Sequence, residues 1–238
     1  ASDAVDRYLS EVADDSELQT GNFQDLRKRL LSSGMSFYEK LLEEKPRDRS
    51  QLVAQALAHA RLWRLHYYYF SDFNAALSHA GKAHGVWEKL LSDDPLDGTG
   101  RSRLASSHTL LGMTLSALGD RKQAREHFEK ALQVSRSLVR DFPNVDDYKR
   151  VLGTYAGNFA NYVGNKKEAA QLRQEAVEIK EYFHKKSPEH EGYRVGLSWY
   201  LANMDDLASQ QRALEIRKGL ARDFPTLPKH RKHLAISH

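Results

Sequence analysis

The chain has 238 residues, 40% of them hydrophobic and 29% charged, a balance typical of a folded protein with a substantial core. The absence of cysteine excludes disulfides, thiolate metal sites and cysteine nucleophiles. No apolar run approaches the roughly 18 residues that cross a bilayer, so we expect no membrane insertion within the chain. The formal charge of +4 is too small for an extended nucleic-acid surface, and we expect no nucleic-acid partner.

Five of the six prolines divide the chain at regular intervals of 49, 48, 45 and 37 residues: Pro46, Pro95, Pro143, Pro188 and Pro225. Proline ends a helix because it lacks an N–H group and restricts the residue before it. The spacing therefore predicts an array of repeats. In chain order we expect, within one domain, an N-terminal helical segment at 1–46 that ends in the first long helix, helical hairpins at 47–95, 96–143, 144–188 and 189–225, and the start of a further helix at 226–238.

The residues before each of these prolines share one helical register. A small residue lies 12 positions before each proline: Gly34, Ala83, Ala131, Ala176 and Ala213. Apolar residues lie nine positions before: Phe37, Val86, Val134, Ile179 and Ile216. Further apolar residues lie five positions before: Leu41, Leu90, Leu138, Phe183 and Leu220. Offsets of three and four mark one face of an α-helix, and the small residue allows a neighbouring helix to approach closely.

A second helix precedes this one in each unit, most clearly at 103–118 and 149–163. The turns Gly119-Asp120 and Gly164-Asn165 separate the two helices, since Gly suits a left-handed helix end and Asp or Asn suits the next helix start. A single helical hairpin cannot bury its apolar face, so the hairpins must stack. The sequence therefore predicts an all-α fold, a right-handed α-solenoid of stacked helical hairpins.

In the third hairpin the residues resemble the tetratricopeptide pattern: Leu111, Gly112, Leu115, Gly119, Ala124, Phe128 and Ala131. The motif LVRDFPNVDDYKRVLG and its echo LARDFPTLPKHRKHLAISH resemble the long tetratricopeptide units of large bacterial signalling proteins. Residues 4–46 further resemble the segment that follows the kinase domain and a membrane span in one group of bacterial serine/threonine kinases. This resemblance implies an attached kinase domain and favours an extracytoplasmic location, which the sequence itself leaves unknown. It implies no kinase activity here, because the glycine-rich loop and the His-Arg-Asp and Asp-Phe-Gly elements are absent.

The sequence offers no catalytic residues, no metal site and no cofactor site. Ser106, Ser107 and His108 are neighbours on one helix, where adjacent side chains point about 100° apart and cannot form a nucleophile–base pair. The eleven histidines form no His-Glu-x-x-His motif. His59 with His66, and His230 with His233, lack the third and fourth ligands that a tight metal site needs. We therefore expect surface or interface histidines and no enzyme activity.

The tetratricopeptide resemblance implies a concave groove lined by the first helix of each hairpin. Mapping that register places the following residues in the groove: Arg61, Leu65, Tyr68, Tyr69, Thr109, Met113, Thr154, Asn158, Asn161, Tyr162, Trp199 and Asn203. Asn offers a donor and an acceptor for an extended peptide backbone, although a solvated polar face would explain these residues equally well. The aromatic run 67–70 circles a helix, so at least one ring faces solvent or a groove. The sequence allows two interpretations of this run: the rings pack at the turn, or at least one of them contacts a ligand.

We expect a non-catalytic module that binds a protein or peptide segment in this groove. Basic residues do not cluster among the groove positions, so recognition of a free C-terminal carboxylate is not expected. The alternative is a structural spacer or self-assembly scaffold, because residues 1–100 carry a net charge of −4 and residues 101–238 a net charge of +8. Such charge contacts weaken as salt increases.

Two irregularities occur towards the C-terminus. The distance from Tyr148 to Pro188 is 40 residues, but the equivalent distance from Tyr193 to Pro225 is 32. Either the repeat is shortened between Met204 and Ser209 or a loop is missing there from the numbering, and we expect the missing loop. The chain also stops at position 238 within the first helix of another unit, so we expect its exposed apolar end to be covered by more chain or by a partner.

Overall fold

The structure is a computed structural model that describes residues 2–15, 18, 23–225 and 227–235. All regular structure in that part of the chain is helical, as the repeat pattern predicts. The α-helices are α1 (Ser2–Asp14), α2 (Gln24–Glu43), α3 (Arg49–Leu65), α4 (Phe73–Asp93), α5 (Gly98–Ala117), α6 (Arg121–Asp141), α7 (Asp146–Ala160), α8 (Lys166–Lys186), α9 (Glu191–Ala202), α10 (Leu207–Asp223) and α11 (Pro228–Ala235). A π-helical segment, η2 (His66–Phe70), directly continues α3.

Polar caps fix where the second helix of each hairpin begins. In each case a side-chain oxygen accepts a hydrogen bond from the backbone N–H group three residues later: Asp72 before α4, Asp120 before α6, Asn165 before α8 and Asp206 before α10. Gly119 ends the preceding helix with a φ of +89°, in the left-handed region that favours glycine. Gly164 bends the chain without a positive φ, so the left-handed helix end expected there does not form.

The repeated register describes the core. Helices α2, α4, α6, α8 and α10 end two or three residues before the five prolines. All five small residues 12 positions before the prolines are buried. Gly34 shows why a small residue is needed, because a Cβ atom there would lie 2.4 Å from Leu9 Cδ2 of α1. The hairpin of α1 and α2 is therefore held together by a close helix contact.

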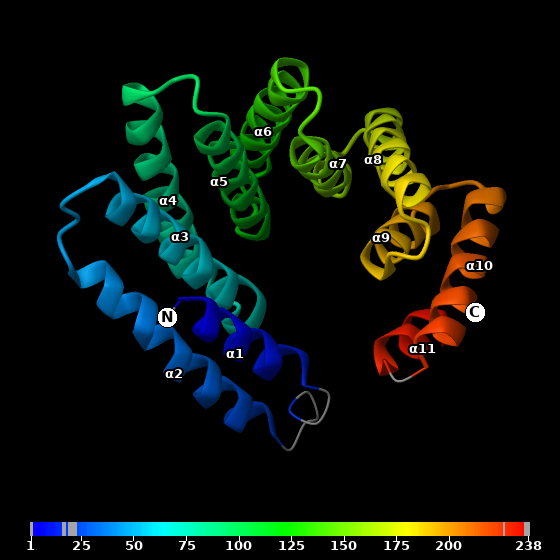
Figure 1. Cartoon of the computed structure of the whole chain (residues 1–238), viewed down its shortest axis with the longest axis horizontal. Coiled ribbons are helices and arrows are strands. Elements are labelled where there is room, and N and C mark those ends of the chain that lie inside the picture. The colour runs from blue at the N-terminus through cyan, green and yellow to red at the C-terminus, as the bar shows by residue number, and fades with distance from the viewer. Residues whose placement is uncertain (1, 16–17, 19–22, 226, 236–238) are drawn as a thin grey trace. The chain divides into compact units, whose positions relative to one another are not determined.

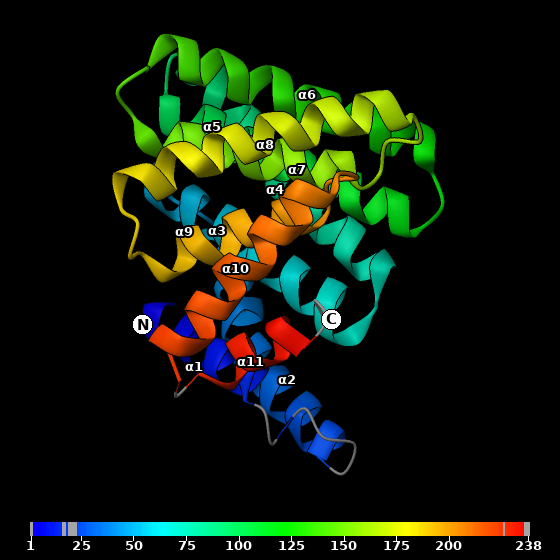
Figure 2. The same ribbon diagram turned by 90° about the vertical axis from the view of Figure 1, so that its right-hand side faces the viewer.

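The chain forms two compact units, residues 1–131 and 132–238. In the first unit α1 packs on α2, α2 on α3, α3 on α4 and α4 on α5 (Figure 1). In the second unit α7 packs on α8, α8 on α9, α9 on α10 and α10 on α11 (Figure 2). In both series, consecutive helices are in contact. This is the contact pattern of stacked helical hairpins.

The last hairpin of the second unit has a shorter connection between its helices than the hairpin of α7 and α8. Residues 203–206 join α9 to α10, and the backbone N–H groups of Asn203 and Met204 donate to carbonyls at the end of α9. The expectation that a loop is missing between Met204 and Ser209 stays a prediction. Helix α11 follows, and its buried His230 places Nε2 3.0 Å from Glu191 Oε1 at the start of α9. The predicted chain end at residues 236–238 lies outside the described residues.

None of the described helices combines the length and the apolar character needed to span a bilayer.

Candidate functional site

Helix α7 forms the centre of the candidate site, because two glycines let its neighbours approach closely. A Cβ atom on Gly153 would lie 2.8 Å from Ile179 Cγ2 of α8. A Cβ atom on Gly157 would lie 1.9 Å from the Tyr200 ring of α9. These contacts leave Thr154 and Asn158, which are one helical turn apart, on a face of α7 close to both neighbouring helices. Both side chains are half-buried.

The remaining predicted residues of the second unit lie near the ends of α7 and α9. Trp199 remains 43% exposed, and its ring meets the buried Tyr200 edge-on at 4.8 Å. Asn203 donates from Nδ2 to the Trp199 carbonyl oxygen at 2.7 Å, so its amide caps α9. Asn161 is exposed at the end of α7 and Tyr162 is half-buried in the turn that follows. The predicted positions in this unit are thus accessible, but Asn203 is partly occupied by its own helix.

Lys180 lies beside the candidate site, although the sequence register does not identify it. It belongs to α8, a second helix, yet its Nζ atom lies 3.5 Å from Thr154 Oγ1 and 5.7 Å from the centroid of the Tyr200 ring. Burial and, to a smaller extent, the charge of Arg150 lower the pKa of its ammonium group. Basic residues do not cluster among the predicted groove positions, and Lys180 places one basic group beside them from a second helix.

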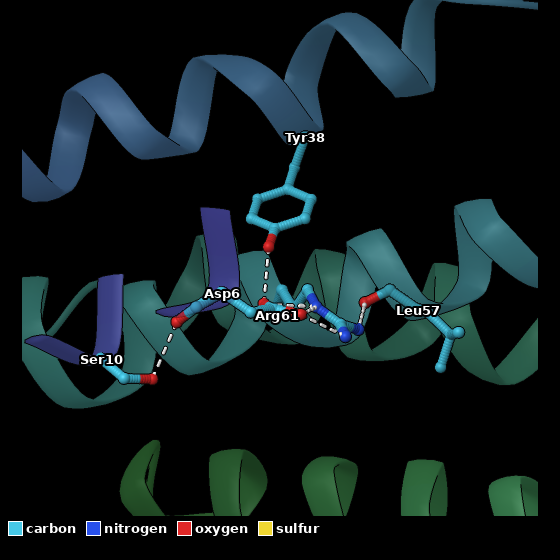
Figure 3. A network of polar contacts seen from close by, with 5 residues as sticks. All are labelled: Asp6, Ser10, Tyr38, Leu57 and Arg61. Atoms are coloured by element: carbon cyan, nitrogen blue, oxygen red, sulfur yellow. Dashed lines mark hydrogen bonds and ion pairs between the residues drawn. The ribbon is translucent and has the colours of Figure 1, made fainter. Parts of the chain in front are cut away.

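In the first unit the predicted Arg61 is used to hold helices together (Figure 3). Its guanidinium pairs with the Asp6 carboxylate of α1, with Nη2 2.5 Å from Oδ2 and Nε 2.6 Å from both oxygens. Tyr38 of α2 donates its hydroxyl to the same carboxylate at 2.6 Å. Burial alone would raise the pKa of Asp6, but the hydrogen bonds from Arg61 and Tyr38 leave it below its ordinary value. Arg61 thus connects α3 to the first hairpin.

Three other predicted groove residues of the first unit are buried. Leu65 belongs to a core cluster with Leu9, Leu31 and Leu62. Thr109 is 3% exposed and donates its hydroxyl to the Ala105 carbonyl of its own helix. Met113 is also buried. These side chains contribute packing where the register had placed them in the groove.

The aromatic run 67–70 lies in η2 and not in a regular α-helix. The backbone N–H of Asp72 donates to the His66 carbonyl, and Ser71 adopts a φ of +53°. Tyr68 is 56% exposed, which confirms that one ring faces outwards. Tyr69 instead packs against the core below the Arg27 guanidinium, which lies 5.2 Å from its ring centroid. Segments of π-helix are frequent at functional sites, so ligand contact at Tyr68 stays a prediction.

Two histidine pairs repeat at equivalent positions of the second and third hairpins. The Nδ1 atoms of His59 and His79 lie 2.9 Å apart, and so do those of His108 and His127. Burial lowers the pKa of His59 and of His79 to about 4, and that of His108 to about 3. The sequence alone indicates this repetition, because His108 follows His59 by 49 residues and His127 follows His79 by 48 residues.

The histidines also contact neighbouring polar side chains. His84 of α4 places Nδ1 3.0 Å from Ser107 Oγ, so Ser107 pairs across helices and not with the adjacent His108. Ser107 is 2% exposed and donates to the Leu104 carbonyl. Among the described side chains, no group of three or more His, Asp or Glu residues is arranged to hold a metal ion. The side chain of His233, considered with His230 above, lies outside the described residues.

Comparison with known proteins identifies the repeat type. The family model of the tetratricopeptide repeat matches residues 104–144. The solved structure of TTC0263, a thermophilic tetratricopeptide protein of Thermus thermophilus, is similar with a TM-score of 0.52 and 16% identity, covering 98% of each chain. The complex of the TPR2AB domain of yeast Sti1 with pHSP90 is similar at a TM-score of only 0.28 and 11% identity, covering 100% of this chain and 98% of that chain, which is too weak to bear on function. No curated protein matches the sequence.

The repeat match covers the third hairpin, where the tetratricopeptide pattern was found in the sequence. In that hairpin a Cβ atom on Gly112 of α5 would lie 3.0 Å from the Phe128 ring of α6. This is the close contact between the two helices that the pattern requires. The similarity to TTC0263 extends the same fold over the rest of the chain. Residues 104–144 therefore match the tetratricopeptide repeat, and the chain has an all-α solenoid fold of helical hairpins.

Proposed function

We propose that the chain is a non-catalytic module that binds a protein or peptide segment along its first helices. The observation that carries this proposal is the face formed by Thr154, Asn158 and Trp199 on α7 and α9. Trp199 keeps a large apolar ring partly in solvent, and no hydrogen bond to the Asn158 amide is found among the described residues. Aromatic anchors beside free amide groups are suited to holding an extended peptide backbone.

The test is a peptide-binding measurement with a matched control. An immobilised library of random decapeptides is probed with the wild-type chain, the double variant Asn158→Ala/Trp199→Ala and the control Leu96→Ala, whose side chain is 80% exposed in a loop of the first unit. We expect the double variant to bind recovered peptides at least tenfold more weakly and the control to bind them as the wild type does. Equal binding by all three chains would contradict the proposed face.

We further propose that the module is the sensor or docking part of a larger bacterial signalling protein, such as a serine/threonine kinase with this region outside the cytoplasm. The support is the sequence resemblance of residues 4–46. An antibody against the chain should detect, in cells of the source organism, a phosphorylated protein well above 27.2 kDa that added protease cleaves in intact cells. A 27.2 kDa protein protected from protease would contradict this proposal.

Self-assembly is the second candidate function, and one observation in the first unit favours it. Between α1 and α2 lies a cavity of about 310 Å³ lined mostly by apolar groups: Ala4, Val5, Tyr8, Ser33, Gly34 and Phe37. Phe23 and Leu26, at the start of α2, are also exposed. Light scattering should show a mass that rises with concentration, and Tyr8→Ser/Leu26→Ser should abolish the rise. A constant monomer mass would leave only the binding role.

A further inference from the structure

Lys180 occupies a position that is interior in other hairpins. It lies eight residues before Pro188. Before Pro225 the equivalent residue is the half-buried Arg217, and before Pro46, Pro95 and Pro143 the equivalent residues are Tyr38, Trp87 and Ser135. All three of those side chains are buried. A charged ammonium group in such a position is unfavourable unless an opposite charge and hydrogen bonds compensate for the lost water.

The acidic side chains on the same helix do not provide that compensation. Glu175 pairs with Arg136, with 2.6 Å between Oε2 and Nη2. Glu178 accepts from Gln174 at 2.9 Å, and Glu181 pairs with Arg212. Among the described residues, no carboxylate forms an ion pair with Lys180. The positive charge of Arg150 from α7 makes the surroundings of the ammonium group more positive still.

The polar atoms around the Lys180 ammonium are suited to an anion. The Thr154 hydroxyl accepts from Nζ at 3.5 Å and donates its own proton to the Arg150 carbonyl at 3.1 Å. The Asn158 amide follows one turn later on the same face of α7. Gly196 of α9 faces the Lys180 side chain, since a Cβ atom there would lie in ordinary contact with it, 3.6 Å from Cδ and 4.0 Å from Nζ. The ring of Tyr200 borders the site, and burial raises the pKa of its hydroxyl to about 12, so that it stays a neutral donor.

We propose that Lys180 and Asn158 bind the carboxylate of an Asp or Glu side chain in the segment held by α7 and α9. This inference rests on the proposed peptide-binding function and names the chemistry of one subsite within it. A carboxylate accepts strong, charge-assisted hydrogen bonds from an ammonium group and further bonds from amide donors. It would also neutralise a charge that has no carboxylate partner among the described residues.

The test uses acetylated random decapeptides attached to beads through their C-termini, so that side chains are the only source of carboxylates. We expect the wild-type chain to enrich peptides with Asp or Glu at one position and the variant Lys180→Met to lose this enrichment. Changing that Glu to Gln in a recovered peptide should weaken wild-type binding about tenfold and binding to Lys180→Met less than twofold. Binding that needs a free C-terminus, or an unchanged preference in Lys180→Met, would overturn the proposal.

A second measurement does not depend on the variant folding. NMR of the wild-type Lys180 ammonium, titrated with pH, should show its pKa rising when the Glu peptide is added, because a bound carboxylate favours the charged form. An unchanged pKa with bound peptide would overturn the carboxylate site while the binding function stands. If no peptide binds the wild-type chain at all, both the binding function and the subsite are refuted.

Discussion

Arg61 of the first unit and Lys180 of the second are both half-buried cations beside a tyrosine, yet they differ in what compensates their charge. Arg61 forms an ion pair with the Asp6 carboxylate, and this hydrogen-bonded contact raises the pKa of the Arg61 guanidinium. Lys180 has only a hydroxyl and an aromatic ring, and burial lowers its pKa. A cation that the chain itself neutralises stabilises the fold, whereas one left without a carboxylate is available to a ligand.

The largest expected effect follows from removing the compensated cation. Arg61→Met leaves the half-buried Asp6 carboxylate with only the Tyr38 hydroxyl, and we expect the free energy of unfolding to fall by about 2 to 3 kcal/mol. Urea denaturation followed by circular dichroism measures the change. Asp6→Asn is the matched variant, and it should also destabilise the chain. A loss below about 0.5 kcal/mol in both would show that Arg61 does not hold the first hairpin.

Acidification should weaken the first unit through its histidine pairs. The pKa values of His59, His79 and His108 lie below the ordinary value of 6.5 because burial disfavours their charged forms. Below pH 6.5 the unfolded chain binds protons that these folded rings do not, so the stability present above pH 6.5 is lost as the pH falls towards 4. We expect a loss of about 2 kcal/mol over that range, after allowance for solvent screening.

A matched variant localises this pH effect. The fourth hairpin has Gly153 and Leu172 where the third has His108 and His127. His127→Leu therefore copies a side chain that the repeat already accepts, and it should flatten the dependence of the urea midpoint on pH. A pH dependence as steep as in the wild type would mean that other groups cause it.

Removing the uncompensated cation should have the opposite sign from removing Arg61. Lys180→Met takes a charge out of a position that is interior in other hairpins, and we expect the unfolding free energy to rise by about 1 kcal/mol at neutral pH. The lowered pKa of Lys180 agrees with this expected gain in stability, because the folded state disfavours the protonated form that prevails at neutral pH. A clear destabilisation in urea would indicate that the ring of Tyr200 already compensates the charge.

The smallest effect is expected at Tyr68. Its ring is 56% exposed, and its edge contacts are with Trp63 and Tyr67. Tyr68→Ser should change the unfolding free energy by no more than about 0.5 kcal/mol. Peptide binding should change less than twofold if the binding face is confined to α7 and α9. A larger loss of binding, with stability preserved, would make η2 part of the binding surface.

The sequence predicted the helices and the core well because both depend on local spacing. The small residues 12 positions before each proline and most apolar residues five positions before are buried, as the helical register requires. The turn at Gly119-Asp120 follows from residue chemistry that acts over four positions. These features need no knowledge of which elements meet in space.

The site was harder to predict because its key contacts join distant positions. The partner of Arg61 is 55 residues away in sequence, and Leu65 is buried among residues of the first hairpin. A register gives the face on which a residue lies, but not which other helix covers that face. The tetratricopeptide register leaves out Lys180 for a related reason, because it draws groove residues from first helices alone. The sequence does not show that Lys180 lacks a carboxylate partner, because that depends on which residues pair with the glutamates of the same helix.

The unequal exposure of the three tryptophans has a spectroscopic consequence. Trp63 and Trp87 are each 4% exposed, and the indole N–H of Trp63 donates to Thr114 Oγ1 at 2.7 Å. Only Trp199 offers its ring to solvent. Iodide should therefore quench mainly the red-shifted part of the intrinsic emission, and a ligand that covers α9 should protect it. The chain thus contains its own optical reporter of occupancy, without any added label.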